Sequence, residues 1–185
     1  HDTCRRQRQM CIRDSLYTGS GAVARKVVAN AATNLVPTTL ELGGKSPTII
    51  SADADLKLAA KRIMFVKTLN AGQICLSPDY IMIKKGLEEK LISELQQVFK
   101  SFYPESNTKD YTSMVNDHHH QRMHEYLQDA KEKGAKIHNL GEFDSNENNI
   151  MTTKVLLNVN DNMRVMQEEI FGPLLPVMVL SLIHI

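Results

Sequence analysis

One cysteine lies in a sequence context that suits covalent chemistry. Cys75 follows Gly-Gln-Ile and precedes Leu-Ser-Pro, between a segment with helical spacing and a segment with strand character. Because Gly72 has no side chain, the backbone there can come close to a ligand, and Pro78 fixes the exit of the loop. A thiolate is a strong nucleophile, and this loop could present one to a substrate. The alternative is a buried structural cysteine, the commonest role of a free thiol.

A glutamate beside two glycines marks a second point of interest. Glu41 closes a run with strand character and is followed by Leu42-Gly43-Gly44-Lys45-Ser46-Pro47. Two glycines permit a sharp change of chain direction, so we expect a domain boundary near them. A carboxylate that enters a crevice between domains can act as a general base on a water molecule. The alternative is a strand-end glutamate that is simply solvated.

An acid and an aromatic residue form a third signal near the C-terminus. Glu169 and Phe171 lie two residues apart in Gln-Glu-Glu-Ile-Phe-Gly-Pro, which spans residues 167–173. Carboxylate oxygens accept hydrogen bonds from ribose hydroxyls, and a phenyl face packs against a flat ring. The pair could therefore serve a nucleotide. The alternative is a capping acid next to a core phenylalanine.

The composition excludes several other classes of function. Among 185 residues, 22 are basic and 21 are acidic, which gives a net charge of +1. This balance gives no reason to expect nucleic acid or an anionic membrane as a partner. The sequence shows no apolar run of membrane-spanning length and no signal-peptide pattern. Three cysteines do not make a disulfide framework, so we expect a reducing, cytoplasmic setting.

Both ends of the sequence differ from the rest. Residues His1–Ser15 are polar and arginine-rich with no apolar period, and Ser181–Ile185 follow a strand-like run without a stop signal. We expect both segments to be non-native ends that take no part in the fold. Cys4 and Cys11 would then have no function.

The remaining chain alternates helical and strand patterns. Residues Thr18–Ser20 are expected to form a turn in which Ser20 caps the first helix, whose inner stripe would be Val23, Val27, Ala31 and Leu35. This alternation favours an α/β fold with a largely parallel sheet. The spacing predicts helices at 20–35, from Asp53 or Asp55 to 70, at 86–103, from Asn116 or Asp117 to 134 and at 162–170, and strands at 38–42, 47–51, 79–84, 135–140, 151–159 and 174–180.

Four histidines near residue 120 raise the question of a metal site. His120 and His124 are four residues apart and could share a helix face, with His118 and His119 beside them. No cysteine or acidic residue with convincing ligand spacing accompanies them. We therefore expect a solvated helix start and no metal.

Four segments, taken in order, resemble the aldehyde dehydrogenase superfamily. Residues 17–20 are similar to its FTGS segment, 41–47 to ELGGKSP, 72–75 to GQxC and 168–173 to EEIFGP. The resemblance runs from Leu16 to Leu180. The residues around Cys75 (Leu-Asn-Ala-Gly-Gln before it, Pro-Asp-Tyr after it) resemble the class 3-like branch, and coniferyl aldehyde dehydrogenases in particular.

This resemblance implies a fold and a division into domains. Residues 44–180 would form the catalytic (thiol) domain, a Rossmann-like parallel sheet with helices. Residues 16–43 would be the last βα unit of the NAD(P)-binding domain. Residues 1–15 and 181–185 would lie outside both domains.

The resemblance also implies a mechanism. The Cys75 thiolate would attack the aldehyde, its backbone N–H would stabilise the oxyanion, and Glu41 would activate the water that hydrolyses the resulting thioester. The cofactor would be NAD or NADP. By their match to the family's motifs, its binding residues would be Gly19, Ser20, Leu42, Glu169 and Phe171.

The resemblance also implies the partners of the protein. A small-molecule aldehyde would be the substrate, and the full-length enzyme would be a homodimer. The family's second oxyanion donor and its adenosine-ribose lysine come from upstream segments that this sequence does not contain, so we expect the chain alone to be inactive. Three alternatives remain: a truncated paralogue acting as an interaction module, a CoA-acylating dehydrogenase, which usually lacks a base at the position of Glu41, and a glutamyl-phosphate reductase, which lacks the ELGG pattern.

Overall fold

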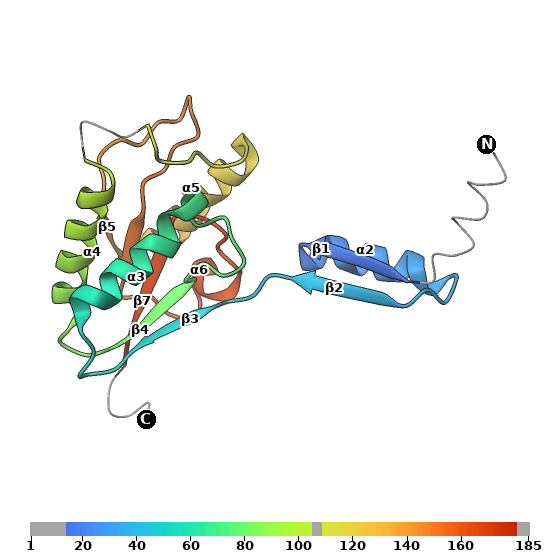
Figure 1. Cartoon of the computed structure of the whole chain (residues 1–185), viewed down its shortest axis with the longest axis horizontal. Coiled ribbons are helices and arrows are strands. Elements are labelled where there is room, and N and C mark those ends of the chain that lie inside the picture. The colour runs from blue at the N-terminus through green and yellow to red at the C-terminus, as the bar shows by residue number, and fades with distance from the viewer. Residues whose placement is uncertain (1–13, 105–108, 181–185) are drawn as a thin grey trace. The chain divides into compact units, whose positions relative to one another are not determined.

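The computed structural model describes residues 14–104 and 109–180 of the chain (Figure 1). The chain divides into two compact units between Gly44 and Lys45.

The smaller unit is a β-α-β motif. Strand β1 (Ser15–Gly19) leads into helix α2 (Gly21–Ala32), and strand β2 (Thr38–Leu42) returns parallel to β1. The Ser20 hydroxyl accepts a hydrogen bond from the Val23 N–H at 3.4 Å, which caps the first turn of the helix as the sequence predicted. Ser15, which the sequence analysis assigned to a non-native end, is the first residue of β1.

Three expectations for this unit were wrong. Thr18 and Gly19 belong to β1 rather than to a turn, because their backbones pair with Glu41 and Leu42 of β2. Helix α2 ends at Ala32 instead of near residue 35, where the chain takes a left-handed conformation. The predicted inner stripe is not buried: Val23 is 45% and Leu35 is 89% exposed, while Ala24 is buried. A sheet of two strands offers a helix too small a face to cover such a stripe.

The larger unit is built on a five-stranded sheet with the strand order β3-β4-β7-β6-β5. The pairs β3–β4, β4–β7 and β6–β7 are parallel, and the edge strand β5 is antiparallel to β6. The predicted α/β fold with a largely parallel sheet is confirmed. The strands are β3 (Pro47–Ile50), β4 (Tyr80–Lys84), β5 (Lys136–Asn139), β6 (Lys154–Leu157) and β7 (Leu174–Leu180).

Helices cover this sheet. Helix α3 packs beside α4, and α5 contacts α6 and β5 (Figure 1). The Asp55 and Asn116 side chains accept backbone N–H bonds at the starts of α3 and α5, which settles the two caps that the sequence left open. The helical segments are α3 (Leu56–Thr68), the short 3₁₀ helix η1 (Leu69–Gly72), α4 (Glu88–Phe102), α5 (Asp117–Glu132) and α6 (Arg164–Gln167).

The core lies between the sheet and these helices. On α5 the buried residues include Met123, Tyr126, Leu127 and Ala130, which share one helix face. On α3 they include Leu56, Ala60, Ile63, Met64 and Lys67, while Ala59 and Val66 are half-buried. A lysine on the inward face was not anticipated.

No helix among the described residues has both the length and the apolar character needed to cross a membrane. Residues 1–13 and 181–185, most of the two segments assigned to non-native ends, lie outside the described residues, as do Cys4 and Cys11.

Candidate active site

The Cys75 thiol is exposed at the surface of the larger unit. Helix α3 and the 3₁₀ helix η1 lead into its loop, and β4 follows it. The cysteine is therefore not buried in the core, which was the structural alternative. Among the described residues, the Cys75 N–H has no hydrogen-bond acceptor. The loop thus presents a thiol and an adjacent backbone donor.

The backbone before the cysteine adopts an uncommon conformation. Asn70 and Ala71 both have φ 52° and ψ 34°, and Gly72 has φ 74°. A Cβ added at Gly72 would lie 2.5 Å from the carbonyl oxygen of Gly172 and 3.2 Å from that of Lys67. Gly72 is thus required both for its conformation and for its close contact with the segment after Phe171. The Cys75 loop and the segment with Glu169 and Phe171, the first and third sequence signals, therefore lie side by side.

Gln73 fixes the loop from its other side. Its buried side chain donates to the Asn70 and Ser113 carbonyls at 2.9 and 3.2 Å, and it accepts the Val115 N–H at 2.9 Å. These bonds join the loop to the segment that precedes α5. The glutamine of the Gly-Gln-Ile-Cys sequence is therefore a structural residue, and its side chain holds the thiol's loop in place.

Three charged residues whose roles were not predicted, Lys45, Lys67 and Asp79, are linked to the end of this loop. The buried Asp79 forms an ion pair with Lys45 and accepts the Ile170 N–H at 2.9 Å. Lys67 is buried and donates to the Pro78 carbonyl at 2.9 Å. Burial lowers the pKa of Lys67 from 10.5 to about 8, an effect that the nearby Asp79 opposes. The signal that could have found Lys67 is its spacing of four residues from Ile63 on the inner face of α3.

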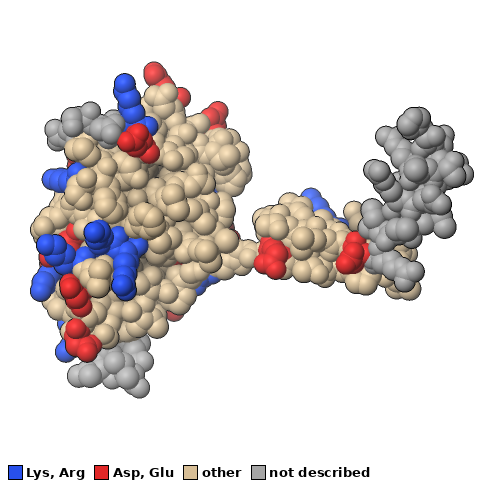
Figure 2. Space-filling view, in the orientation of Figure 1, with Lys and Arg blue, Asp and Glu red and all other residues tan. Residues whose placement is uncertain are grey.

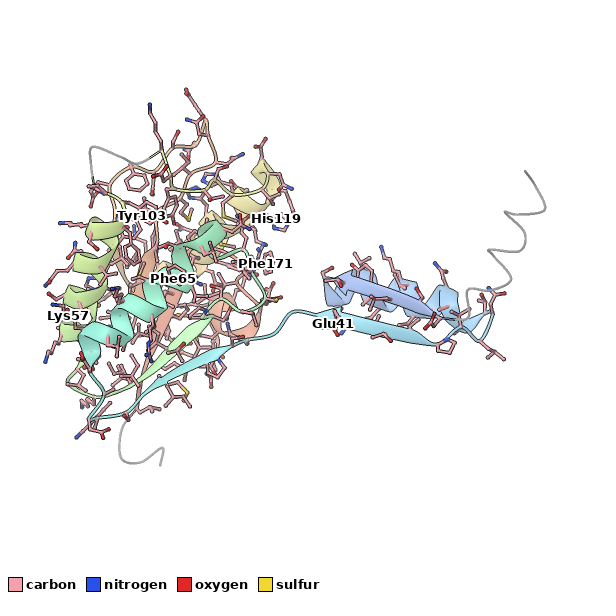
Figure 3. The ribbon with its side chains drawn as sticks, viewed as in Figure 1. Glu41, Lys57, Phe65, Tyr103, His119 and Phe171 are labelled. Atoms are coloured by element: carbon pink, nitrogen blue, oxygen red, sulfur yellow. The ribbon has the colours of Figure 1, made fainter. Side chains whose placement is uncertain are left out.

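The predicted nucleotide pair, Glu169 and Phe171, stands on either side of Ile170, whose N–H donates to Asp79. Phe171 is 39% exposed and has φ 47°, an unusual backbone angle for a residue with a side chain. Figure 3 shows it at the surface of the larger unit, so it is not the core phenylalanine of the alternative interpretation. Glu169 is half-buried, and its carbonyl accepts a bond from Arg122 at 3.4 Å.

The neighbouring Glu168 has a different environment. Its carboxylate accepts hydrogen bonds from the Tyr126 hydroxyl at 2.8 Å and from Arg164 at 3.2 Å. The bond from Tyr126 and the one from Arg164 lower the pKa of Glu168, and burial opposes them. This acid is therefore held by side chains of α5 and α6.

The remaining candidates gather in the smaller unit. In the β1–β2 register Gly19 lies opposite Leu42, and Glu41 lies one residue before this pair. Ser20 follows Gly19 and begins α2. Four predicted residues thus meet at the carboxyl ends of two parallel strands, where α/β folds commonly bind nucleotides. Glu41 is exposed, and its side chain projects from β2 (Figure 3).

The histidines of α5 depart from expectation in part. His120 is buried rather than solvated, and its ring lies 4.6 Å from that of His124. Burial, with help from neighbouring Arg122 and His118, lowers the pKa of His119. Within residues 14–104 and 109–180, no three side chains of metal-binding type come close enough together to hold an ion.

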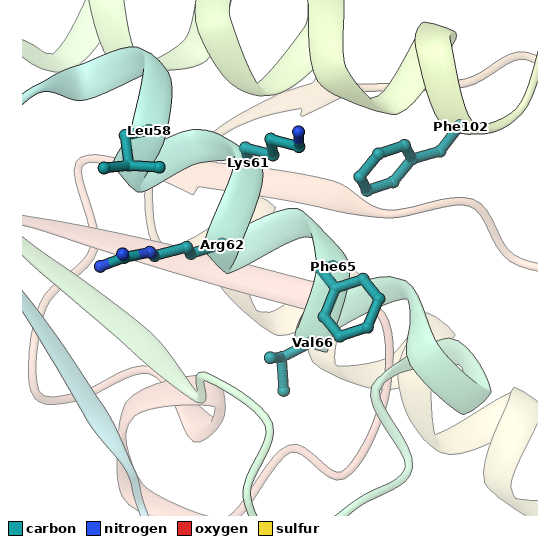
Figure 4. Close-up of a pocket in the computed structure, with 6 residues that line it drawn as sticks. All are labelled: Leu58, Lys61, Arg62, Phe65, Val66 and Phe102. Atoms are coloured by element: carbon teal, nitrogen blue, oxygen red, sulfur yellow. The ribbon is translucent and has the colours of Figure 1, made fainter.

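A shallow groove of about 340 Å³ lies on the larger unit, and none of the predicted residues lines it (Figure 4). Phe65 and Val66 of α3 and Phe102 of α4 form its apolar part, and Lys61 and Arg62 flank it. Basic side chains gather over this part of α3 and α4 in Figure 2.

Comparison with known proteins decides the family. Residues 10–183 match the model of the aldehyde dehydrogenase family. The chain belongs to this family. The α/β fold of the larger unit agrees with that of solved aldehyde dehydrogenases.

Curated aldehyde dehydrogenases resemble the chain across most of its length. It is 47% identical over 163 residues to a probable coniferyl aldehyde dehydrogenase of Pseudomonas aeruginosa, covering 88% of the chain and 34% of that protein. It is 40% identical over 164 residues to a dimeric NADP-preferring aldehyde dehydrogenase of Rattus norvegicus, covering 88% of the chain and 35% of that protein. The chain spans about a third of the length of the curated relatives it matches.

Solved aldehyde dehydrogenases show the same architecture. The substrate-bound AldH of Staphylococcus aureus superposes with a TM-score of 0.83 at 36% identity, over 92% of this chain and 37% of that one. A betaine aldehyde dehydrogenase of the same organism, in complex with NAD+, gives a TM-score of 0.79 at 27% identity, over 91% and 35%.

Proposed function

We propose that this chain carries the nucleophile and the general base of an NAD(P)-dependent oxidation of an aldehyde to a carboxylic acid. The observation that supports it most is the exposed thiol of Cys75 in a loop that Gly72 and Gln73 hold rigidly. An accessible sulfur on a fixed backbone is what covalent catalysis requires.

Cys75 begins the reaction in this proposal. Its thiolate adds to the aldehyde carbon, and the carbonyl oxygen becomes an oxyanion. The Cys75 N–H, which has no acceptor among the described residues, donates to that oxygen. The tetrahedral adduct then gives up a hydride and collapses to a thioester of Cys75.

Glu41 completes the cycle. Its carboxylate takes a proton from a water molecule, whose oxygen attacks the thioester carbon and displaces the sulfur. The products are the carboxylic acid and the free thiol. An exposed carboxylate at a strand end can carry this proton, and its presence favours hydrolysis over transfer of the acyl group to CoA.

The nucleotide cofactor accepts the hydride when it is bound. The residues present fit such a group. Ser20 and the N-terminus of α2 would hold its pyrophosphate, with Gly19 and Leu42 beside them. The Glu169 carboxylate would accept from a ribose hydroxyl, and the exposed ring of Phe171 would pack beside it.

We propose an apolar, aromatic or fatty aldehyde as the substrate. Leu69 and Leu76, on either side of Cys75 in the sequence, are 52% and 78% exposed and would favour such a group. The curated name of the Pseudomonas aeruginosa relative, which includes coniferyl aldehyde, supports the same class. We also propose a homodimer for the full-length enzyme. A reducing compartment such as the cytoplasm would keep the exposed thiol of Cys75 reduced.

The test is a chimera in which this chain replaces the matching third of the Pseudomonas aeruginosa relative. We expect Cys75→Ser to lower aldehyde-dependent NAD(P)H formation by roughly a thousandfold or more while cofactor binding stays within about twofold. Loss of cofactor binding in step with activity would contradict the role of Cys75.

Glu41 has its own test in the same chimera. We expect Glu41→Gln to leave a pre-steady-state burst of NADH while the steady-state rate falls, because hydrolysis of the thioester becomes limiting. Glu41→Asp, which keeps the carboxylate, serves as the matched control. An unchanged steady-state rate in Glu41→Gln would remove Glu41 from the mechanism.

A further inference from the structure

Asp79 is a buried carboxylate four residues after the nucleophile. Its side chain is 5% exposed, and it lies between the Cys75 loop and β4. A carboxylate removed from water is costly unless charged or polar partners compensate for the lost hydration. The identity of these partners therefore shows what Asp79 holds in place.

Each partner of Asp79 belongs to another segment of the larger unit. One carboxylate oxygen is paired with the Lys45 ammonium group, and the other accepts the Ile170 N–H at 2.9 Å. The Asp79 N–H itself donates to the Ser46 carbonyl at 2.9 Å. The residue thus joins the end of the Cys75 loop to segments 45–46 and 165–170.

Lys45 strengthens the same connection. Its ammonium group also donates to the Val165 carbonyl at 2.6 Å and to the Glu168 carbonyl at 3.0 Å. Both members of the ion pair therefore hold segment 165–170. Charge-assisted hydrogen bonds of this kind are stronger than neutral ones, so the end of this segment is held firmly.

The held segment carries the two residues proposed to meet the cofactor. Ile170 lies between Glu169 and Phe171, so its N–H bond to Asp79 fixes the backbone from which both side chains extend. Phe171 has a left-handed φ of 47°, which costs free energy and persists where the surroundings enforce it. On its far side Gly172 is held against Gly72 of the Cys75 loop.

We propose that Asp79 is a positioning residue that sets Glu169 and Phe171 relative to the Cys75 loop. The effect of Asp79 on catalysis rests on the proposed function. The hydrogen bonds of Asp79, from which its positioning role is argued, do not depend on that function. Asp79 touches neither substrate nor cofactor. It acts through the Ile170 N–H and through Lys45.

Amide hydrogen exchange on the full chain tests this proposal directly. In Asp79→Ala we expect the Ile170 amide to exchange about tenfold faster or more, after correction for global stability, because it loses a charged acceptor. In Asp79→Asn the side-chain oxygen can still accept, so exchange at Ile170 should stay within about threefold of the wild type. This rescue by the amide separates positioning from a general loss of stability.

Asp144→Ala is the matched control. Asp144 also pairs with a buried lysine, Lys154, and accepts a backbone N–H, that of Thr152 at 2.8 Å. We expect this variant to speed exchange at Thr152 and to leave Ile170 unchanged. Equal acceleration at Ile170 in both alanine variants would overturn the proposal.

Alkylation of Cys75 by iodoacetamide, followed by peptide mass spectrometry, gives a second measurement. We expect the rate to change about threefold or more in Asp79→Ala and to stay constant in Asp144→Ala, because the Gly72–Gly172 contact links segment 165–172 to the loop. An unchanged rate in Asp79→Ala would contradict the coupling. Neither measurement depends on turnover, so failure of the proposed function would leave these results intact.

Lys45→Gln serves if Asp79→Ala does not fold. It keeps the bond from Ile170 to Asp79 but weakens the hold on the Val165 and Glu168 carbonyls. The Glu168 amide, which donates to the Arg164 carbonyl at 3.0 Å, should then exchange about threefold faster or more. Exchange at the wild-type rate would show that the ion pair does not hold segment 165–170, and would overturn the proposal.

Discussion

Gly72 occupies a position that has no room for a side chain. We expect Gly72→Ala to lower the free energy of unfolding by about 2–4 kcal/mol, because a left-handed backbone and a steric overlap add together. Gly86→Ala is the control: Gly86 has φ 94°, but a Cβ there would meet nothing within 4 Å. It should cost about 1–2 kcal/mol from the backbone alone. Urea unfolding measures both, and equal losses would argue against the contact with Gly172.

Lys67 makes the stability of the protein depend on pH. Its pKa is 10.5 in the unfolded chain and about 8 in the folded one, so between these values the unfolded state binds more protons. The free energy of unfolding therefore rises with pH from about 8 to about 10.5 and carries the full penalty below 8. A difference of this size corresponds to roughly 3 kcal/mol.

Lys67→Met should remove this dependence. At pH 7 the variant gains up to roughly 3 kcal/mol by losing a buried charge. It loses about 1–2 kcal/mol because the Pro78 carbonyl is left without a donor. At pH 7 the net effect is therefore stabilising. The stabilisation should be smaller at pH 9.5, where more of the wild-type Lys67 is neutral. Urea unfolding at both values measures it, with the exposed Lys57→Met as control. If the free energy of unfolding changed with pH in parallel for Lys67→Met and the wild type, Lys67 would not be the source of the pH dependence.

The part of the site that could be predicted is the part with local signatures. The need for a glycine at position 72 and the loop position of Cys75 could be predicted, because a glycine and a cysteine in a loop have few common explanations. The roles of Asp79 and Lys45 could not, because they depend on partners about 90 and 120 residues away in the sequence, Ile170 and Val165. Local pattern carries no information on such pairing.

Helix α3 precedes the Cys75 loop in the chain, and the first turn of this helix is capped by one carboxylate. Asp55 accepts from the Lys57 and Leu58 N–H groups at 3.0 and 3.1 Å. We expect Asp55→Ala to lower the free energy of unfolding by about 1 kcal/mol. Asp53→Ala is the control, because Asp53 bonds Ser51 instead of the helix. Thermal unfolding of both variants measures the difference, and an equal effect would deny Asp55 its role as the cap.

Elements with strong boundaries were predicted closely, and short polar ones were not. Strands β2 and β7 have the predicted ends, because Pro37 and Pro173 stand directly before them. Strand β1 was missed, because Ser15–Gly19 alternates weakly and is defined by its pairing with β2. Strand β6 is shorter than predicted. Residues 151–153 are buried but lie outside the ladder, so burial extended the apolar pattern beyond the strand.

At the scale of the whole molecule, the two units differ in how much core they hold. The buried hydrophobic cluster runs from Ile50 to Val177 and lies within the larger unit. Of the described residues in the smaller unit, Ala24 is the buried hydrophobic one. Below about 40 residues, a domain with so little core is rarely stable.

We therefore expect a shortened chain that begins at Lys45 to keep its helical circular dichroism and a cooperative thermal transition. A peptide of residues 14–44 should be largely unfolded by the same measurement, because it cannot bury enough apolar surface. Loss of the cooperative transition in the shortened chain would mean that the larger unit depends on the segment before it.

The exposed sulfur of Cys75 also has a chemical cost. Any path wide enough for an aldehyde admits hydrogen peroxide, which converts a thiolate to a sulfenic acid and then, irreversibly, to a sulfinic acid. In a preparation kept in air, the Cys75 thiol would then be oxidised step by step while the fold stayed intact. Ageing of the protein would appear as a mass increase of one oxygen at a time on the Cys75 peptide, long before it appeared in a melting curve.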